Sequence, residues 1–325
     1  MNVTILGAGA WGTSLARLLG QGDHKVTLWG HVAEWLEEIR QTGRNERFLP
    51  GIALPKGLAL ESDLPRAITG AECVIVAVPS QPFREVTRHL AQHSGMIVSV
   101  AKGIEYATGL TMCGVLAQTA PRAQCVALSG PTFAIEVARD IPTAIVAASR
   151  DLPTASRAQA LFSRPTFRVY TSADLLGVEL GGALKNVIAI AAGVGDGLGF
   201  GDNSKAALVT RALVEIRRLG VACGAQADTF AGLGGLGDLM VTCFSRHSRN
   251  RAFGERVGKG EKPADIAAST LAVAEGYPTA RSAYQLARHH MVTTPVIDEV
   301  YAMLYEGKNV AQAVRDLMSR DLKSE

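Results

Sequence analysis

The sequence predicts an α/β fold: a doubly wound, mostly parallel sheet in the N-terminal half, followed by an all-α C-terminal domain. Two observations carry this prediction. Up to Ser172, short and solidly apolar runs alternate with helical segments, as strands buried on both faces do. From Ala173 onward the strand signal stops and only helical periodicity continues. We therefore expect two domains, residues 1–172 and 173–325.

The predicted elements follow in chain order. Strands are expected at Asn2–Leu6, Lys25–Trp29, 73–79, 96–101, 125–130, 142–149 and 167–172. Helices are expected at 13–20, 32–39, 82–90, 108–118, 175–192, 204–224, 278–290, 294–306 and 309–318. Residues 193–203 contain five glycines and are expected to form a loop between two helices.

Composition narrows the class of protein. The 325 residues hold 33 Lys and Arg against 30 Asp and Glu, a net charge of +3 without long runs of one sign, which argues against a nucleic-acid partner. Five scattered cysteines without a CxxC motif predict neither disulfides nor a metal site. Neither a leader nor an apolar window of membrane-spanning length is evident. We expect a cytoplasmic protein with no membrane span.

The first strand leads into Gly7-Ala8-Gly9-Ala10-Trp11-Gly12 and then a helix. This is a GxGxxG motif in the context that a Rossmann-like dinucleotide site requires. Gly7 would permit the tight turn, Gly9 the approach of a pyrophosphate, and Gly12 the packing of helix on strand. The helix N-terminus would offer its amides to the phosphates. A plain glycine-rich turn is the alternative.

The end of the second strand bears on the choice of cofactor. NAD-specific enzymes usually carry an acidic residue there for the ribose 2′-hydroxyl, whereas this chain has Gly30-His31 and no acid before Glu34. The sequence therefore leans towards NADPH, with His31 as a donor to the 2′-phosphate, or towards use of both cofactors. His31 as a cap of the following helix is the alternative.

Two further candidates follow strands, at the sheet edge where ligands bind in such folds. Lys102 comes directly after the strand at 96–101, and Gly130 ends the strand at 125–130. Pro131 is expected at the first helical position after Gly130, where free amides would suit the nicotinamide carboxamide or a substrate oxygen. A solvated lysine and a simple helix start are the alternatives.

The helix at 175–192 contains a lysine in apolar surroundings. Lys185 and Asn186 interrupt a stripe of apolar residues that recur every fourth position, namely Leu176, Leu180, Leu184, Ile188 and Ala192. A desolvated lysine can exchange protons near neutral pH. A lysine that snorkels to water or forms an ion pair is the alternative.

A second dense stretch is AGLGGLGDLMVTCFSRHSRNRAFG at 231–254. Its glycines indicate close backbone approach or unusual conformations, and Asp238 follows them directly. Ser248-Arg249-Asn250 offers hydroxyl, guanidinium and amide groups suited to a phosphate, unless it is a basic surface loop. Glu275, before a glycine turn, would meet ribose or a lysine if it is not merely solvated.

Together these motifs resemble bacterial glycerol-3-phosphate dehydrogenases over the whole chain. The similarity lies in GAGAWGT at 7–13, LWGH at 28–31, SVAKGIE at 99–105, SGPTFAIEVARDIPTA at 129–144, ALKNVIAIAAGVGDGLGFGDNSKAAL at 183–208, GLGGLGDLMVTC at 232–243, SRN at 248–250 and AEGY at 274–277.

The resemblance implies a phosphogluconate-dehydrogenase-like C-terminal domain and a reversible hydride transfer. The reaction would reduce dihydroxyacetone phosphate to sn-glycerol 3-phosphate with NADP or NAD as cofactor, supplying glycerophospholipid synthesis. Lys185 matches the family's proton donor and acceptor. The expected partners are this phosphorylated triose and a second copy in a homodimer.

The resemblance also assigns contacts residue by residue. Substrate contacts match Lys102, Gly130, Thr132, Lys185, Asp238, Ser248, Arg249 and Asn250, with Thr132 where many relatives have serine. Cofactor contacts match Ala10, Trp11, His31, Lys102, Ala134, Arg249, Val273 and Glu275, together with Gly7, Gly9 and Gly12 of the motif and a position near Phe48. Another hydroxyacid dehydrogenase of the same plan, or a non-catalytic NAD(P)-binding sensor, is the alternative function.

Overall fold

The computed structural model describes residues 1–270 and 273–321, and its backbone contacts divide the chain into two compact units. Unit 1 comprises Met1–Lys102 and Leu110–Val178, and unit 2 comprises Gly103–Gly109 together with the residues from Glu179 onward. The short segment 103–109 thus belongs to unit 2 although unit 1 flanks it in the sequence.

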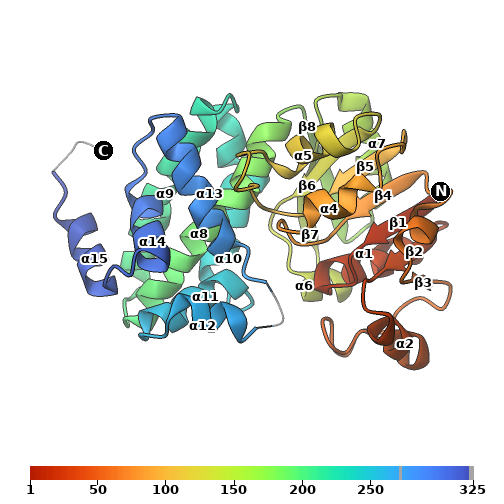
Figure 1. Ribbon diagram of the computed structural model, residues 1–325, viewed down its shortest axis with the longest axis horizontal. Coiled ribbons are helices and arrows are strands. Elements are labelled where there is room, and N and C mark those ends of the chain that lie inside the picture. Colours follow the sequence, from red (N-terminus) through yellow and green to blue (C-terminus); the bar gives the residue numbers. More distant parts are fainter. Residues whose placement is uncertain (271–272, 322–325) are drawn as a thin grey trace. The chain divides into compact units, whose positions relative to one another are not determined.

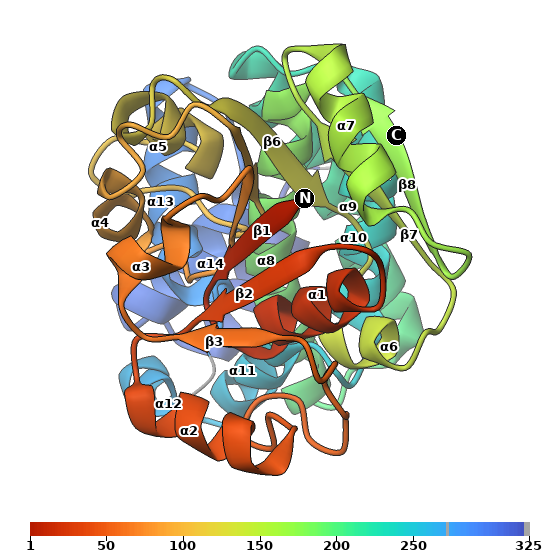
Figure 2. The same cartoon turned by 90° about the vertical axis from the view of Figure 1, so that its right-hand side faces the viewer.

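Unit 1 is built on an eight-stranded sheet in the order β3-β2-β1-β4-β5-β6-β7-β8 (Figure 2). The strands are β1 (Asn2–Leu6), β2 (Lys25–Trp29), β3 (Ala59–Glu61), β4 (Cys73–Val76), β5 (Met96–Ser99), β6 (Gln124–Ser129), β7 (Thr143–Ala148) and β8 (Phe167–Ser172). Every neighbouring pair is parallel except β6 and β7. This confirms the mostly parallel, doubly wound sheet, to which β3 adds an edge strand that the sequence did not indicate.

Helices cover both faces of this sheet. They are α1 (Ala10–Gly20), α2 (Ala33–Thr42), α3 (Leu64–Ile68), α4 (Phe83–Arg88), α5 (Met112–Thr119), α6 (Ala134–Ala138) and α7 (Leu152–Phe162). Along β4, Cys73 and Ile75 join a core with α1, α6 and α7, whereas Val74 and Val76 join a second core with α3, α4 and α5. Alternate side chains of β4 thus enter opposite cores, which is why all four of its residues are apolar.

From Glu179 onward, the described part of unit 2 consists of helices joined by turns and loops (Figure 1). The chain forms α8 (Leu175–Gly197), α9 (Asp202–Ala222), a 3₁₀ turn η1 (Ala227–Ala231), a π-helical turn η2 (Leu233–Gly237), α10 (Asp238–Phe244), α11 (Arg249–Gly258), α12 (Pro263–Ala268), α13 (Gly276–His289), α14 (Pro295–Tyr305) and α15 (Val310–Met318). The all-α character predicted for the C-terminal region is confirmed.

The expected loop at 193–203 is wrong over its first five residues, because α8 continues to Gly197. A Cβ atom at Gly193 would lie 1.9 Å from the carbonyl oxygen of Arg251, and one at Gly254 would lie 2.0 Å from that of Ile190. Backbone of α8 and α11 is therefore in direct contact, which only glycine permits. Tertiary packing here outweighs the low helix propensity of glycine.

Helix α8 bears on the expectation that the chain has no membrane span. It is long and apolar enough to cross a bilayer, but 83% of its most apolar window is buried inside the structure. A core helix at the centre of a helical unit shows the same length and composition. Its apolar residues are accounted for by packing within the protein.

Candidate functional site

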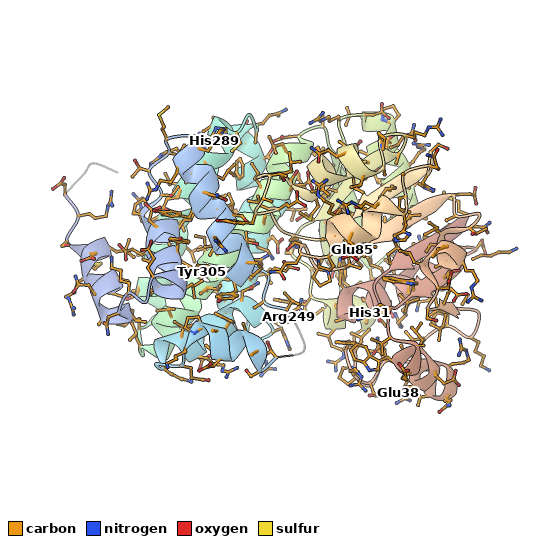
Figure 3. All side chains as sticks on the ribbon, viewed as in Figure 1. His31, Glu38, Glu85, Arg249, His289 and Tyr305 are labelled. Carbon is orange, nitrogen blue, oxygen red and sulfur yellow. The ribbon has the colours of Figure 1, made fainter. Side chains whose placement is uncertain are left out.

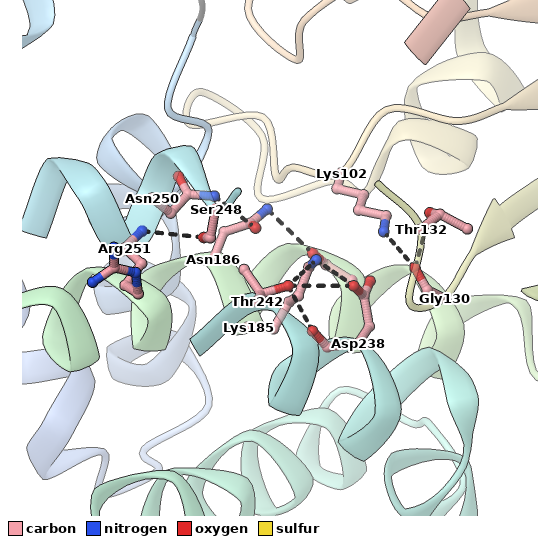
Figure 4. Close-up of polar contacts among 11 residues, drawn as sticks. Lys102, Gly130, Thr132, Lys185, Asn186, Asp238, Thr242, Ser248, Asn250 and Arg251 are labelled. Carbon is pink, nitrogen blue, oxygen red and sulfur yellow. Dashed lines mark hydrogen bonds and ion pairs between the residues drawn. The ribbon is translucent and has the colours of Figure 1, made fainter. Parts of the chain in front are cut away.

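The centre of the candidate site in unit 2 is a buried ion pair (Figure 4). Lys185, on α8, is only 6% exposed, and Asp238, the first residue of α10, is 1% exposed. The Lys185 ammonium donates to Asp238 Oδ1 and, at 2.7 Å, to Thr242 Oγ1. Lys185 is thus buried and paired at once, which excludes a lysine that snorkels to water and confirms the other alternative, a lysine in an ion pair.

Glycine packing brings the two charges together. A Cβ atom at Gly181 would lie 2.5 Å from the carbonyl oxygen of Gly234, so η2 presses its backbone directly against α8. Gly181 and Lys185 are four residues apart and share one face of α8. The chain that crosses at Gly234 therefore delivers Asp238, a turn further on, to the ammonium. Gly235 is a second point of close approach, since its Cβ atom would lie 2.3 Å from the Phe230 oxygen, and none of the glycines at 232–237 has a positive φ.

Thr242 was not among the predicted site residues. Its hydroxyl donates to the backbone carbonyl oxygen of Asp238 at 2.6 Å, which leaves an oxygen lone pair facing Lys185. Asp238 and Thr242 are four residues apart on α10, so the pair orients the ammonium from one helical face. That spacing after a glycine-rich turn is the signal that could have identified Thr242.

The predicted phosphate contacts lie at the start of α11. Ser248 is the N-cap, and its Oγ accepts from the amide of Arg251 at 3.2 Å. Arg249 is the first helical residue, and its side chain is exposed. The N-terminal amides, the Ser248 hydroxyl and a guanidinium together form a local environment that favours an anion. Of the alternative, a basic surface loop, the loop conformation is wrong for Arg249 and Asn250, which are helical, whereas the phosphate contact stays a prediction.

Asn250, predicted as a substrate contact, also joins three helices of unit 2. Its Nδ2 donates to Asn186 Oδ1 at 2.9 Å, and its Oδ1 accepts from the amide of Gly276 at 2.8 Å (Figure 4). The side chain thus joins α8, α11 and the start of α13, and at most one N–H bond is left for a ligand. Glu275 precedes a helix, not the expected glycine turn, because α13 begins at Gly276.

Glu275 and Arg249 are near enough to interact electrostatically within unit 2. Both were predicted to contact cofactor, as was Val273, which is exposed. The structure therefore groups Lys185, Asp238 and Thr242 in one place, and links the start of α11 to Glu275 through Asn250 and Gly276.

In unit 1, three predicted substrate contacts share one backbone carbonyl (Figure 4). Lys102 Nζ and Thr132 Oγ1 each donate to the Gly130 oxygen at 3.1 Å. Gly130 has a φ of +150° and lies against Ile145, a backbone position that suits glycine. The expected helix start at Pro131 is wrong, because α6 begins at Ala134 after the N-cap Phe133.

The GxGxxG motif was expected to hold the pyrophosphate, and its three glycines have different surroundings. A Cβ atom would lie 2.7 Å from the Ala77 oxygen if added to Gly7, and 1.9 Å from the Gly7 oxygen if added to Gly12. A Cβ atom on Gly9, the N-cap of α1, would have no heavy atom within 4 Å. Open space in front of the helix amides at Gly9, Ala10 and Trp11 fits a dinucleotide phosphate.

His31 follows β2 and does not cap α2, whose N-cap is Val32. Figure 3 labels His31 in unit 1. Its ring centroid lies 6.4 Å from that of Trp29 and 6.1 Å from that of Trp35. Trp35 in turn makes an edge contact with Phe48, with centroids 5.5 Å apart. The capping alternative is therefore wrong, and His31 belongs to an aromatic row at the end of the strand.

Comparisons with known proteins agree with this geometry. Models of the NAD-dependent glycerol-3-phosphate dehydrogenase N-terminus and C-terminus match residues 2–155 and 174–315. Glycerol-3-phosphate dehydrogenase [NAD(P)+] of Geobacter sulfurreducens is 50% identical over 99% of this chain and 98% of its own length. The enzyme of Syntrophotalea carbinolica is 49% identical over 100% and 99%. The crystal structure of glycerol-3-phosphate dehydrogenase from Coxiella burnetii superposes with a TM-score of 0.94, at 35% identity over 98% of this chain and 99% of that one.

Proposed function

This chain belongs to the NAD-dependent glycerol-3-phosphate dehydrogenase family, and we propose that its reaction, the NAD(P)H-dependent reduction of dihydroxyacetone phosphate to sn-glycerol 3-phosphate, uses Lys185 as the proton donor. The observation that carries the assignment is the buried contact of Lys185 with Asp238 and Thr242. The reaction fits a role in glycerophospholipid synthesis.

Asp238 favours the ammonium form of Lys185, because a buried carboxylate stabilises an opposite charge at hydrogen-bond distance. Two of the three N–H bonds of the ammonium are directed at Asp238 and Thr242, which fixes the position of the nitrogen. During reduction, Lys185 donates a proton to the oxygen on C2 of the substrate. During oxidation, the neutral amine removes the hydroxyl proton from the same oxygen.

The anion site at the start of α11 supports recognition of the substrate phosphate. Arg249 offers two parallel N–H donors, and the Ser248 hydroxyl and the helix amides offer more. We propose that Gly130, Thr132 and Lys102, which are held together at the Gly130 carbonyl oxygen, also contact substrate oxygens.

Residues 7–12 and His31 support the binding of a dinucleotide. When bound, NAD(P)H supplies the hydride. The helix amides next to Gly9 would hold its pyrophosphate, and His31 would donate to a 2′-phosphate, where no acid repels it. We therefore propose that the enzyme accepts NADPH at least as well as NADH.

The experiment follows oxidation of NADPH and of NADH with dihydroxyacetone phosphate, and with unphosphorylated dihydroxyacetone as a control. Lys185→Ala is expected to lower kcat by roughly 10²–10⁴ while NADPH still binds. Lys308→Ala serves as a matched control, since it also removes ion pairs of a lysine in unit 2. Near-normal turnover of Lys185→Ala would reject the proton donor, and equal turnover of both ketones would reject the phosphate site.

Two expectations about the protein in the cell stay proposals. We propose that it forms a homodimer and acts in the cytoplasm. Light scattering on the purified protein tests the first, and fractionation of cells that express it tests the second.

A further inference from the structure

A closed loop between α2 and β3 lies beside the dinucleotide motif. Residues 43–54 (the 43–54 loop) begin at Gly43, whose φ of +67° ends α2. The amide of Leu54 donates to the Gly43 oxygen at 2.9 Å, and Arg44 forms an isolated bridge with Ala53. The two ends of the loop are therefore bonded to each other, as in compact loops that keep one conformation.

Apolar side chains anchor this loop to α6. Leu49 is 1% exposed and Ile52 is 9% exposed, and both pack with Ala138 in a small core. Ala134 and Ile135 border the same core. The loop is thus a packed part of unit 1, and its buried polar groups need partners of their own.

The side-chain amide of Asn45 forms hydrogen bonds with three parts of unit 1. Its side chain is buried, with the residue 3% exposed. Its Nδ2 donates to the Ala8 carbonyl oxygen at 2.9 Å and to Thr13 Oγ1 at 2.8 Å, and its Oδ1 accepts from the Phe48 amide at 3.3 Å. One amide group thereby joins the GxGxxG turn, the first turn of α1 and the 43–54 loop.

The contact with Ala8 determines where an amide of the motif points. The Ala8–Gly9 peptide bond is trans, as are all peptide bonds of the described residues. In a trans peptide the C=O and the next N–H point in opposite directions. Because Asn45 of the 43–54 loop binds the Ala8 oxygen, the Gly9 N–H of the same peptide points away from that loop. The Cβ position of Gly9 is open as well, with no heavy atom within 4 Å.

We propose that Asn45 is a positioning residue of the dinucleotide site: it holds the Ala8–Gly9 peptide in the orientation that binds a pyrophosphate, and it ties that peptide to the aromatic row through Phe48. The inference rests on the proposed location of the cofactor at residues 7–12. Asn45 acts through the backbone and touches neither reacting atoms nor substrate.

The test compares variants of the full-length protein by fluorescence titration with NADPH and by thermal unfolding. Asn45→Ala removes all three bonds. Asn45→Asp keeps the shape and the acceptor for Phe48 but has no N–H for Ala8. We expect each to raise the Kd for NADPH about tenfold or more, the loss expected for one buried hydrogen bond. With saturating NADPH, the KM for dihydroxyacetone phosphate should stay within twofold of wild type.

Thr119→Val is the matched control. Thr119 is also buried in unit 1 and also bonds a side chain of another helix, Thr87 Oγ1 at 2.9 Å. We expect it to lower the melting temperature without changing the Kd. A Kd within twofold of wild type in both Asn45 variants, with a lowered melting temperature, would make Asn45 merely structural and overturn the proposal.

A further variant keeps the test decisive if neither Asn45 variant folds. Thr13→Val preserves side-chain shape but removes the hydroxyl that accepts from Asn45 and that itself donates to the Ala8 oxygen at 3.4 Å. An unchanged Kd there would show that these bonds do not position the Ala8–Gly9 peptide, and it would overturn the proposal. Gly9→Ala tests the proposed location of the cofactor separately from the role of Asn45. If it binds NADPH as wild type does, the cofactor lies elsewhere, and the proposed cofactor location fails together with the role of Asn45.

Discussion

Gly9 and Gly12 belong to one motif but are glycines for different reasons. A Cβ atom on Gly12 would collide with the Gly7 oxygen, whereas one on Gly9 would meet nothing within 4 Å. We therefore expect Gly12→Ala to lower the free energy of unfolding by about 3 kcal/mol. Gly9→Ala should keep the stability within about 1 kcal/mol and raise the Kd for NADPH tenfold or more, because the added methyl group occupies the approach of the phosphate.

Thermal unfolding and NADPH titration of the two variants check this contrast. The interpretation would be contradicted if Gly9→Ala proved as unstable as Gly12→Ala. It would also be contradicted if Gly9→Ala bound the cofactor normally.

Glu215, on α9, is a buried carboxyl group outside the candidate site. Its two oxygens accept from the Val296 amide at 2.9 and 3.0 Å and from the Ile297 amide at 3.4 Å, at the start of α14. Burial raises the pKa of Glu215 to about 7, and the two amides act against it; Asp298 adds a smaller upward shift and Arg218 a downward one. The carboxylate is therefore more costly in the folded than in the unfolded protein.

The sign of the pH effect follows from proton binding. Between the unfolded pKa of 4.5 and the folded pKa of about 7, the folded protein holds the proton that the unfolded chain has lost. Stability should therefore fall as the pH rises through this range, by about 3 kcal/mol in total.

Glu215→Gln removes that titration and keeps an acceptor for the amides. We expect its melting temperature, relative to wild type, to rise steadily from pH 5 to pH 8. Melting curves at these pH values for both proteins provide the measurement. Parallel pH dependence in the two proteins would show that Glu215 does not titrate in this range.

At the scale of elements, α8 and α11 place the proton donor and the anion site relative to each other within unit 2. Lys185 is on α8, and Arg249 begins α11. Glycines on both helices let their backbones touch, since Cβ atoms at Gly197 and Gly258 would lie 2.4 and 2.5 Å from carbonyl oxygens of the partner helix. The crossing therefore fixes the start of α11 against the helix that carries Lys185.

Alanine substitutions on α8 test this crossing. Gly193→Ala adds a methyl group 1.9 Å from the Arg251 oxygen, whereas Gly195→Ala adds one at an ordinary 3.7 Å from Phe200. We expect Gly193→Ala to destabilise the protein by about 3 kcal/mol and to raise the KM for dihydroxyacetone phosphate, because α11 must move. Gly195→Ala should be neutral or more stable by up to about 1 kcal/mol.

Denaturant unfolding and steady-state kinetics measure both effects. Equal behaviour of the two variants would mean that the crossing tolerates a larger spacing. If Gly193→Ala is destabilised but its KM is unchanged, the anion site does not depend on the packing of α11 against α8.

The same helices show what the sequence could predict. The strands of unit 1 were predictable because burial on both faces demands apolar runs, as in CVIV of β4. The end of α8 was not predictable. Its sequence GVGDG is typical of a loop, and only the contact with α11 explains why it is helical. Strand β3 was missed because its three residues are only partly buried at the edge of the sheet.

A site residue could be predicted where the local sequence marks it, and could not where only partners distant in sequence reveal its role. Lys185, Asp238 and Arg249 were visible because each stands out in local sequence. The roles of Asn45 and of Asn250 as a bridge were not visible in the sequence. Asn45 binds Ala8, 37 residues away, and Asn250 binds Asn186, 64 residues away. Such contacts leave no local pattern, whereas the glycines of the motif do.

At the scale of the whole molecule, residues 103–109 make the two units interdependent. This segment belongs to unit 2, where Ser282 Oγ donates to the Ile104 oxygen at 2.8 Å and Arg281 stacks on Tyr106 at 4.0 Å. Ile104 is 4% exposed, so a fragment that contains only unit 1 would uncover it. Exposed apolar surface of this kind promotes association.

We therefore expect two fragments of residues 1–178 to differ. With the native segment, the fragment should self-associate. With 103–109 replaced by a Gly/Ser linker of equal length, it should stay monomeric, because no partner of Ile104 is then missing. Both should bind NADPH measurably, since residues 7–12 and Asn45 are present. Light scattering and NADPH titration decide the matter: a monomeric native fragment would show that segment 103–109 does not depend on unit 2, and a linker fragment without any NADPH binding would show that residues 7–12 and Asn45 do not bind the cofactor by themselves.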